Sequence, residues 1–158
     1  MRTVYRVLAY AVAIEVVVQA MAVVWAMAGL GKWIDDGGVA DKALFESEDN
    51  PFPEVAGFMI HGVNGMMIIP LIALVLLVVS FFARVPGGVK WAGLVLLLVV
   101  VQATLGLAGH AVPGIGGLHG LNALLLFATA LHTARRSSLG TAPAAATAPR
   151  AAELSGQA

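Results

Sequence analysis

Four long apolar segments dominate the chain, and short polar stretches separate them. They cover approximately residues 4–30, 56–82, 89–109 and 118–134. A helix needs about 20 mainly apolar residues to cross the hydrocarbon core of a bilayer. The pattern therefore predicts an all-α integral membrane four-helix bundle within residues 1–136. The Ala-, Pro-, Ser- and Thr-rich stretch 137–158 is predicted to be a disordered cytoplasmic tail.

The composition agrees with a membrane protein. Hydrophobic residues make up 59% of the chain and charged residues only 11%, whereas a soluble domain has about 25% charged residues. The chain has no cysteine, which excludes disulfides, cysteine-ligated zinc, iron–sulfur clusters and haem attached through cysteines. The basic residues are scattered, so a nucleic-acid partner is not expected.

The charged residues predict the orientation of the four segments. The 31–55 loop contains seven acidic residues and only Lys32 and Lys42. The other basic residues lie at the two ends of the chain and in the second loop: Arg2, Arg6, Arg84, Lys90, Arg135, Arg136 and Arg150. The positive-inside rule then places both termini in the cytoplasm. We expect a multi-pass protein of the plasma membrane with the acidic loop outside.

The first segment has one alternative interpretation, a cleaved signal peptide. Arg2 and Arg6 form a positive region, and Ala26-Met27-Ala28 resembles a cleavage site. The apolar stretch is longer than the core of an ordinary signal peptide, and an internal repeat favours its retention as a helix of the bundle.

The repeat relates the first two segments to the last two. Val16–Ala20 and Val99–Ala103 both read V-V-V-Q-A, while His61-Gly62-Val63-Asn64-Gly65 resembles His119-Gly120-Leu121-Asn122-Ala123. The two glutamines lie 83 residues apart and the two histidines 58 apart; an insertion in the acidic loop accounts for the difference. Two parallel helix-pair repeats predict pseudo-two-fold symmetry about the membrane normal.

This symmetry makes His61 and His119 candidate ligands of a metal. They are expected at equal depth near the outer face, one on each side of the axis. Asn64 and Gly65 share a helix face with His61, as Asn122 and Ala123 do with His119. The small residues offer clearance for a flat macrocycle, and two neutral imidazoles complete the coordination of haem iron. Asn64, Asn122, Gln19 and Gln102 are candidate hydrogen-bonding partners of the cofactor or its ligands.

A purely structural interpretation remains open. Small residues in membrane helices permit close packing, and polar residues hydrogen-bond between helices. Two histidines alone form an incomplete zinc site, because zinc takes three or four protein ligands. Haem supplies four nitrogen atoms itself, so two histidines suffice.

The paired motifs resemble one half of the haem A synthase family, whose halves are four-helix bundles with haem-ligating histidines on the second and fourth helices. The H-G-x-N-G and L-H-G-x-N-A stretches also resemble small actinobacterial four-helix membrane proteins of unassigned function. The resemblance implies that His61 and His119 are axial ligands of a haem, and we expect this haem to be haem b. The chain departs from the synthases in having a single half and no cysteine pair. Gly57 and Phe58 stand where the family has a glutamate one turn before its first histidine.

Other residues suggest further chemistry. Glu15 lies inside the first segment, where a carboxylate is costly, and a count from the helix ends places His132 at the same depth. We expect these two side chains to meet, as a proton relay or part of a quinone site, unless Glu15 only hydrogen-bonds neighbouring helices. His110 is expected at the outer surface, Pro70 to kink the second segment, and residues 113–117 to form a turn.

Three functions are compatible with these features. The leading hypothesis is an iron-binding b-type cytochrome for electron transport, with a membrane quinone or a redox protein as partner. The second is a haem-modifying membrane oxidoreductase related to the synthases, and the third is a non-catalytic subunit or scaffold. A homodimer would recreate the eight-helix arrangement of a full synthase. The sequence leaves the catalytic residues unknown.

Overall fold

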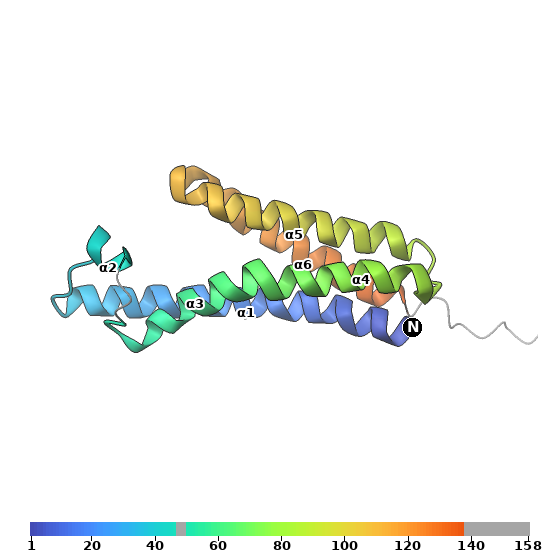
Figure 1. Ribbon diagram of the computed structural model, residues 1–158, viewed down its shortest axis with the longest axis horizontal. Coiled ribbons are helices and arrows are strands. Elements are labelled where there is room, and N and C mark those ends of the chain that lie inside the picture. Colours follow the sequence, from blue (N-terminus) through green and yellow to red (C-terminus); the bar gives the residue numbers. More distant parts are fainter. Residues whose placement is uncertain (47–49, 138–158) are drawn as a thin grey trace, which may run out of the picture.

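The computed structural model describes residues 1–46 and 50–137, and all regular elements in these ranges are helices (Figure 1). The helices are α1 (Arg2–Asp35), α2 (Lys42–Glu46), η1 (Pro53–Val55), α3 (Ala56–Val63), η2 (Asn64–Ile68), α4 (Ile69–Ala83), α5 (Gly88–Ala111) and α6 (Pro113–Arg136). The predicted all-α class is confirmed.

Within the described residues, four continuous helical rods are long and apolar enough to cross a membrane. They are α1, the run from η1 through α4 (Pro53–Ala83), α5 and α6. At about 1.5 Å per residue, the 34 residues of α1 extend about 50 Å. In Figure 1, α1 accordingly runs past the turn between α5 and α6. The chain is a multi-pass membrane protein by the length and composition of these helices.

The four rods form a ring in which each rod packs against two neighbours and lies diagonally opposite the remaining one. α1 packs against α3, α4 and α6, and α5 packs against α4 and α6. The rod containing α3 and α4 therefore lies diagonally opposite α6, and α1 lies opposite α5. This arrangement determines which helix faces can meet across the centre of the bundle.

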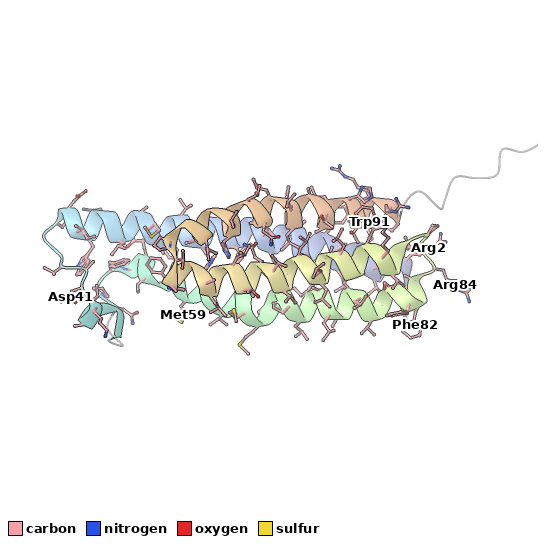
Figure 2. All side chains as sticks on the ribbon, turned by 90° about the horizontal axis from the view of Figure 1, so that it is seen from above. Arg2, Asp41, Met59, Phe82, Arg84 and Trp91 are labelled. Carbon is pink, nitrogen blue, oxygen red and sulfur yellow. The ribbon has the colours of Figure 1, made fainter. Side chains whose placement is uncertain are left out.

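The two ends of the bundle differ in charge. One end, here called the basic end, holds Arg2, the Arg84 loop, the first turn of α5 and the last turn of α6 (Figure 2). Arg2 donates a hydrogen bond to the Arg84 carbonyl over 2.9 Å there. The opposite end, here called the acidic end, holds the loop between α1 and α3 and the α5–α6 turn. The side of the membrane on which each end lies remains a prediction.

The close-packed core occupies the half of the bundle toward the basic end. Tyr5, Leu76, Val95 and Leu126 are fully buried or nearly so, one from each rod. The Tyr5 hydroxyl donates to the Gly88 carbonyl over 3.1 Å and links α1 to the start of α5. Alanines on all four rods belong to the same core and let the helices approach closely.

Toward the acidic end the bundle opens. The α5–α6 pair diverges from α1 and α3 (Figure 1), and α3 packs mainly on α1. The polar residues of the two repeated motifs lie where the close-packed half gives way to this open half. The fold thus places histidine, asparagine and glutamine side chains where the close-packed core ends and the helix pairs begin to diverge.

A π-helical segment, η2, interrupts the second rod and begins at Asn64, three residues after His61. Pro70 explains it: proline has no N–H for the Met66 carbonyl, and its ring crowds that carbonyl. Wider helical turns relieve the conflict, and such π segments are frequent at functional sites. The structure thus shows a local widening of the helix just before Pro70, and the kink expected at Pro70 remains a prediction.

The predicted turn over residues 113–117 is wrong. α6 begins at Pro113, and the change of direction is made by Val112, which has an extended backbone. Proline suits the first helical position, because its fixed φ is helical and no N–H is needed there. The glycines that follow are helical, which lengthens the fourth rod to 24 residues.

Aromatic side chains pack against each other in the described part of the acidic loop. Trp33 and Phe52 have ring centroids 5.8 Å apart, and Phe52 is buried. Gly38 lies against the Trp33 ring. The predicted tail at 137–158 lies outside the described residues except for Ser137, whose hydroxyl donates to the Ala134 carbonyl.

The core packing gives a first testable prediction. Leu126→Ala should lower the free energy of unfolding by at least about 2 kcal/mol, because it leaves a cavity at a side chain that is 2% exposed. Leu124→Ala is the matched control on the same helix, since Leu124 is 68% exposed to the surrounding lipid. Unfolding in mixed detergent micelles measures both. Equal losses for the two variants would contradict this packing.

Candidate functional site

The two candidate ligands meet across the diagonal of the bundle. His61 lies on α3 and His119 on α6, and their ring centroids are 6.1 Å apart with an angle of 60° between the ring planes. Each side chain is partly buried. The structure thus brings together the two histidines that the sequence singled out, although 58 residues separate them.

Each histidine is held by a backbone carbonyl of a neighbouring helix. His61 Nδ1 lies 3.3 Å from the Gln19 carbonyl oxygen on α1, and His119 Nδ1 lies 3.0 Å from the Gln102 carbonyl oxygen on α5. A carbonyl oxygen only accepts hydrogen bonds, so both Nδ1 atoms carry the proton. In a neutral imidazole the other nitrogen then has a free lone pair. Both histidines therefore present Nε2 as a potential ligand.

Gly106 allows the His119 ring to lie against α5. A Cβ atom at position 106 would stand 3.1 Å from Cε1 and 3.2 Å from Nδ1 of His119. Both distances are shorter than ordinary van der Waals contact. The repeated motifs do not single out Gly106, although its spacing of four from Gln102 places both residues on one helix face.

The clearance expected beside Gly65 is occupied by Gln19. A Cβ at position 65 would lie 3.1 Å from Gln19 Oε1. Gly65 therefore makes room for an amide side chain rather than for empty space. Ala123, its counterpart in the second motif, is partly buried on α6.

The asparagines of the two motifs have different partners. Asn122 Nδ2 donates to Gln102 Oε1 over 2.7 Å and to the Leu98 carbonyl over 2.9 Å. Asn64 Nδ2 donates instead to Glu15 Oε2. The polar network of α5 and α6 is thus closed upon itself, whereas that of α1 and α3 includes an acidic side chain.

Because Asn64 binds Glu15, its side-chain NH₂ group is not bound to the Gln19 side chain. Gln19 Nε2 is buried, yet it has no hydrogen-bond partner among the described residues. In the other network, the corresponding Gln102 amide is engaged by Asn122. The Gln19 amide is therefore a free donor next to the histidine pair.

The geometry of the pair fits one metal ion between two imidazoles. Metal–nitrogen bonds of about 2 Å on opposite sides separate the nitrogens by about 4 Å, and each ring centre lies about 1 Å further out. The expected centroid separation is about 6 Å, and the observed one is 6.1 Å. No group of three or more His, Cys, Asp or Glu side chains is assembled in the described parts of the chain. The pair therefore suits a metal that brings its other ligands with it.

The expected meeting of Glu15 with His132 is wrong. Glu15 is bound by Asn64, while the exposed His132 ring packs on Trp91 at the basic end, with centroids 4.2 Å apart. Arg136 lies over the same Trp91 ring. His132 thus belongs to a surface cluster near the end of α6. His110 is exposed in the last turn of α5, apart from the histidine pair.

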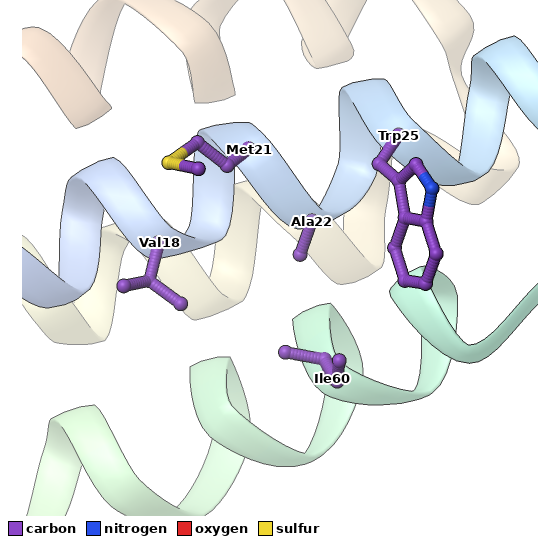
Figure 3. Close-up of a pocket in the computed structure, with 5 residues that line it drawn as sticks. All are labelled: Val18, Met21, Ala22, Trp25 and Ile60. Atoms are coloured by element: carbon purple, nitrogen blue, oxygen red, sulfur yellow. The ribbon is translucent and has the colours of Figure 1, made fainter. Parts of the chain in front are cut away.

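A shallow apolar groove of about 250 Å³ lies between α1 and α3. Figure 3 shows Val18, Met21, Ala22 and Trp25 of α1 around it, with Ile60 of α3 opposite. Its lining includes no histidine or carboxylate and has almost no polar surface. The groove is therefore distinct from the candidate metal site.

Comparison with known proteins adds one match. The model of a family of unknown function, DUF6220, matches residues 51–112. The matched stretch runs from η1 to α5 and includes His61 and Gly106, but not His119. No curated protein and no solved structure matches the chain. The match therefore covers the second and third rods, and the description of the family names no activity.

Proposed function

We propose that the chain is a membrane b-type cytochrome that binds one haem between His61 and His119 and transfers electrons. The observation that carries this proposal is the histidine pair, with both Nδ1 atoms bound to carbonyls and the ring centroids 6.1 Å apart. Ligating histidines almost always donate their other N–H to a carbonyl, carboxylate or water, which fixes the tautomer and the ring orientation.

We propose further that the internal repeat in the sequence corresponds to two related helix pairs in the bundle. The hydrogen bond from His61 to the Gln19 carbonyl has its counterpart in the bond from His119 to the Gln102 carbonyl. The repeat pairs α1 with α5 and the α3–α4 rod with α6, and both pairs lie on diagonals of the bundle. These matches support two helix pairs related by a two-fold axis, with one histidine from each pair meeting at the axis.

The protein's part in this chemistry is to hold and orient the ligands. The Gln19 and Gln102 carbonyls accept the Nδ1 protons of the two histidines, which leaves the Nε2 lone pairs available. Gly106 lets the His119 ring pack against α5. Haem supplies one-electron chemistry when bound between two imidazoles. Because both histidines are held in the same way, neither is marked as the labile ligand that a haem-modifying enzyme would need. This equivalence favours electron transfer.

The location of the pair completes the proposal. We place the acidic end outside the cell and both termini in the cytoplasm, on the strength of the basic residues at the opposite end. The histidines then lie near the outer face of the plasma membrane. Electrons would be exchanged there with a membrane quinone or a redox protein.

Absorption spectroscopy tests the proposal. Protein purified from haem-supplied cells should be coloured, with the sharp reduced bands of low-spin haem and one haem per chain. The extracted pigment should be haem b. Colourless protein would refute haem binding, and a chemically altered pigment would favour the haem-modifying alternative.

A further inference from the structure

The strongest departure from two-fold symmetry at the proposed haem site is a carboxylate. Glu15 occupies the position that Leu98 occupies in the other half, 83 residues later. In that half, Asn122 reaches the Leu98 backbone carbonyl. In this half, Asn64 reaches the Glu15 side chain. An acidic group is thus built into only one side of the histidine pair.

Glu15 is coupled to His61 through short connections. Asn64, which binds the carboxylate, follows His61 by less than one helical turn. Gln19, whose carbonyl holds His61 Nδ1, follows Glu15 by four residues on the same face of α1. The Glu15 carboxylate is therefore linked by one hydrogen bond to the motif that carries His61, and by one helical turn to the residue whose carbonyl holds His61.

The helices packed on this part of α1 carry few other charges. α3 contains one titratable residue, His61, and α6 contains His119 near its start and His132, Arg135 and Arg136 toward the basic end. Both Nδ1 atoms of His61 and His119 are engaged by carbonyls. η2 and α4 contain no titratable residue. On α1 itself, Tyr10 and Arg6 lie more than one turn toward the basic end. Among the acidic residues that the structure describes, Glu15 is the one hydrogen-bonded to Asn64 of the His61 motif.

We propose that Glu15 is an intramembrane proton-binding site that takes up one proton when the proposed cytochrome is reduced. The inference rests on the proposed function. One electron from a redox mediator enters the site between His61 and His119, and one proton from the solvent binds the Glu15 carboxylate. Oxidation returns the electron to an acceptor and the proton to the solvent.

The physical reason is charge compensation. Glu15 in its ionised form is attracted by the positive charge of the oxidised site. Reduction removes one positive charge from the site, and a proton bound by the carboxylate restores the charge balance. Leu98 cannot do the same in the other half. The asymmetry therefore assigns proton uptake to the α1–α3 side.

The local hydrogen bonds suit both forms of Glu15. The ionised carboxylate accepts from Asn64 Nδ2. The protonated form gains a donor, and the Gln19 amide, one turn along the same helix face, offers an acceptor in Oε1. The buried Gln19 Nε2, which has no partner among the described residues, leaves this amide free to adjust. The site can therefore change protonation without leaving a buried charge unsatisfied.

The test is the haem midpoint potential as a function of pH. Where reduction binds one proton, the potential should fall by about 59 mV per pH unit, the value of a tenfold change for a one-electron couple. Glu15→Gln should remove this slope while keeping the low-spin spectrum. His132→Gln, the control, should behave as wild type. Titratable groups that the wild-type protein and both variants share contribute equally to the three slopes. A difference between the slopes therefore reports the substituted residue.

Several outcomes would overturn the inference. A pH-independent potential in the wild-type protein, or an unchanged slope in Glu15→Gln, would show that Glu15 binds no redox-linked proton. If Glu15→Gln fails to bind haem, Glu15→Asp replaces it. This variant should keep a slope with a displaced pH range, because its shorter carboxylate is withdrawn from Asn64, and a profile identical to wild type would contradict the proposal. Colourless wild-type protein would refute the proposed function itself, which distinguishes the two failures.

Discussion

His119→Ala and His61→Ala should each abolish the low-spin haem spectrum, the largest effect expected of any substitution in this chain. Each removes one of two ligands at a site where the ring centroids are 6.1 Å apart, and the described residues place no third histidine beside them. Substituting a residue that only supports a ligand typically costs about tenfold to 100-fold in metal affinity. We expect at least that loss in the haem-to-protein ratio of each variant.

The matched controls are the two remaining histidines. His132→Ala removes a ring that packs on Trp91, and His110→Ala removes an exposed side chain at the end of α5. Both should keep the wild-type spectrum. Imidazole added to His119→Ala should restore low-spin haem, which a purely structural role for His119 would not permit. A low-spin spectrum in both ligand variants without added imidazole would refute the assignment.

Gly106→Val should have the second-largest effect. The new Cβ would lie 3.1 Å from His119 Cε1, with two methyl groups beyond it. The ring cannot retreat without breaking the bond from Nδ1 to the Gln102 carbonyl. His119 should therefore be displaced from its partner across the bundle, and haem occupancy should fall by about tenfold, as for other losses of support to a ligand.

Gly93→Val controls for the cost of valine on the same helix. A Cβ at position 93 meets nothing within 4 Å, so this variant should bind haem as the wild-type protein does. Detergent unfolding of both variants separates misfolding from loss of the site. Full haem occupancy in Gly106→Val would show that His119 does not need its observed position.

The sequence predicted the helical rods and the histidine pair for clear physical reasons. Long apolar runs have few alternatives to helices in a membrane, because their backbone groups must bond internally. The repeated motifs then placed His61 and His119 at related positions, and the structure brings their rings together. Neither step required knowledge of side-chain contacts.

The side-chain contacts at the site depend on the length of each helix and on its rotation about its axis. The pattern of apolar residues determines neither. Counting from the helix ends placed Glu15 level with His132, but α1 continues to Asp35, and Glu15 lies beside Asn64 instead. The hydrogen bonds to the Gln19 and Gln102 carbonyls depend on how two helices approach. In the sequence, Gly106 does not differ from other glycines of an apolar helix. Its role follows from the position of the His119 ring against it.

The central claim is that His61 and His119 ligate the same iron through Nε2. Pulsed electron paramagnetic resonance on the oxidised protein, with ¹⁵N introduced only in histidine, tests it most directly. We predict two directly coordinated histidine nitrogens on one low-spin ferric centre. One coordinated histidine nitrogen, or none, would contradict the claim.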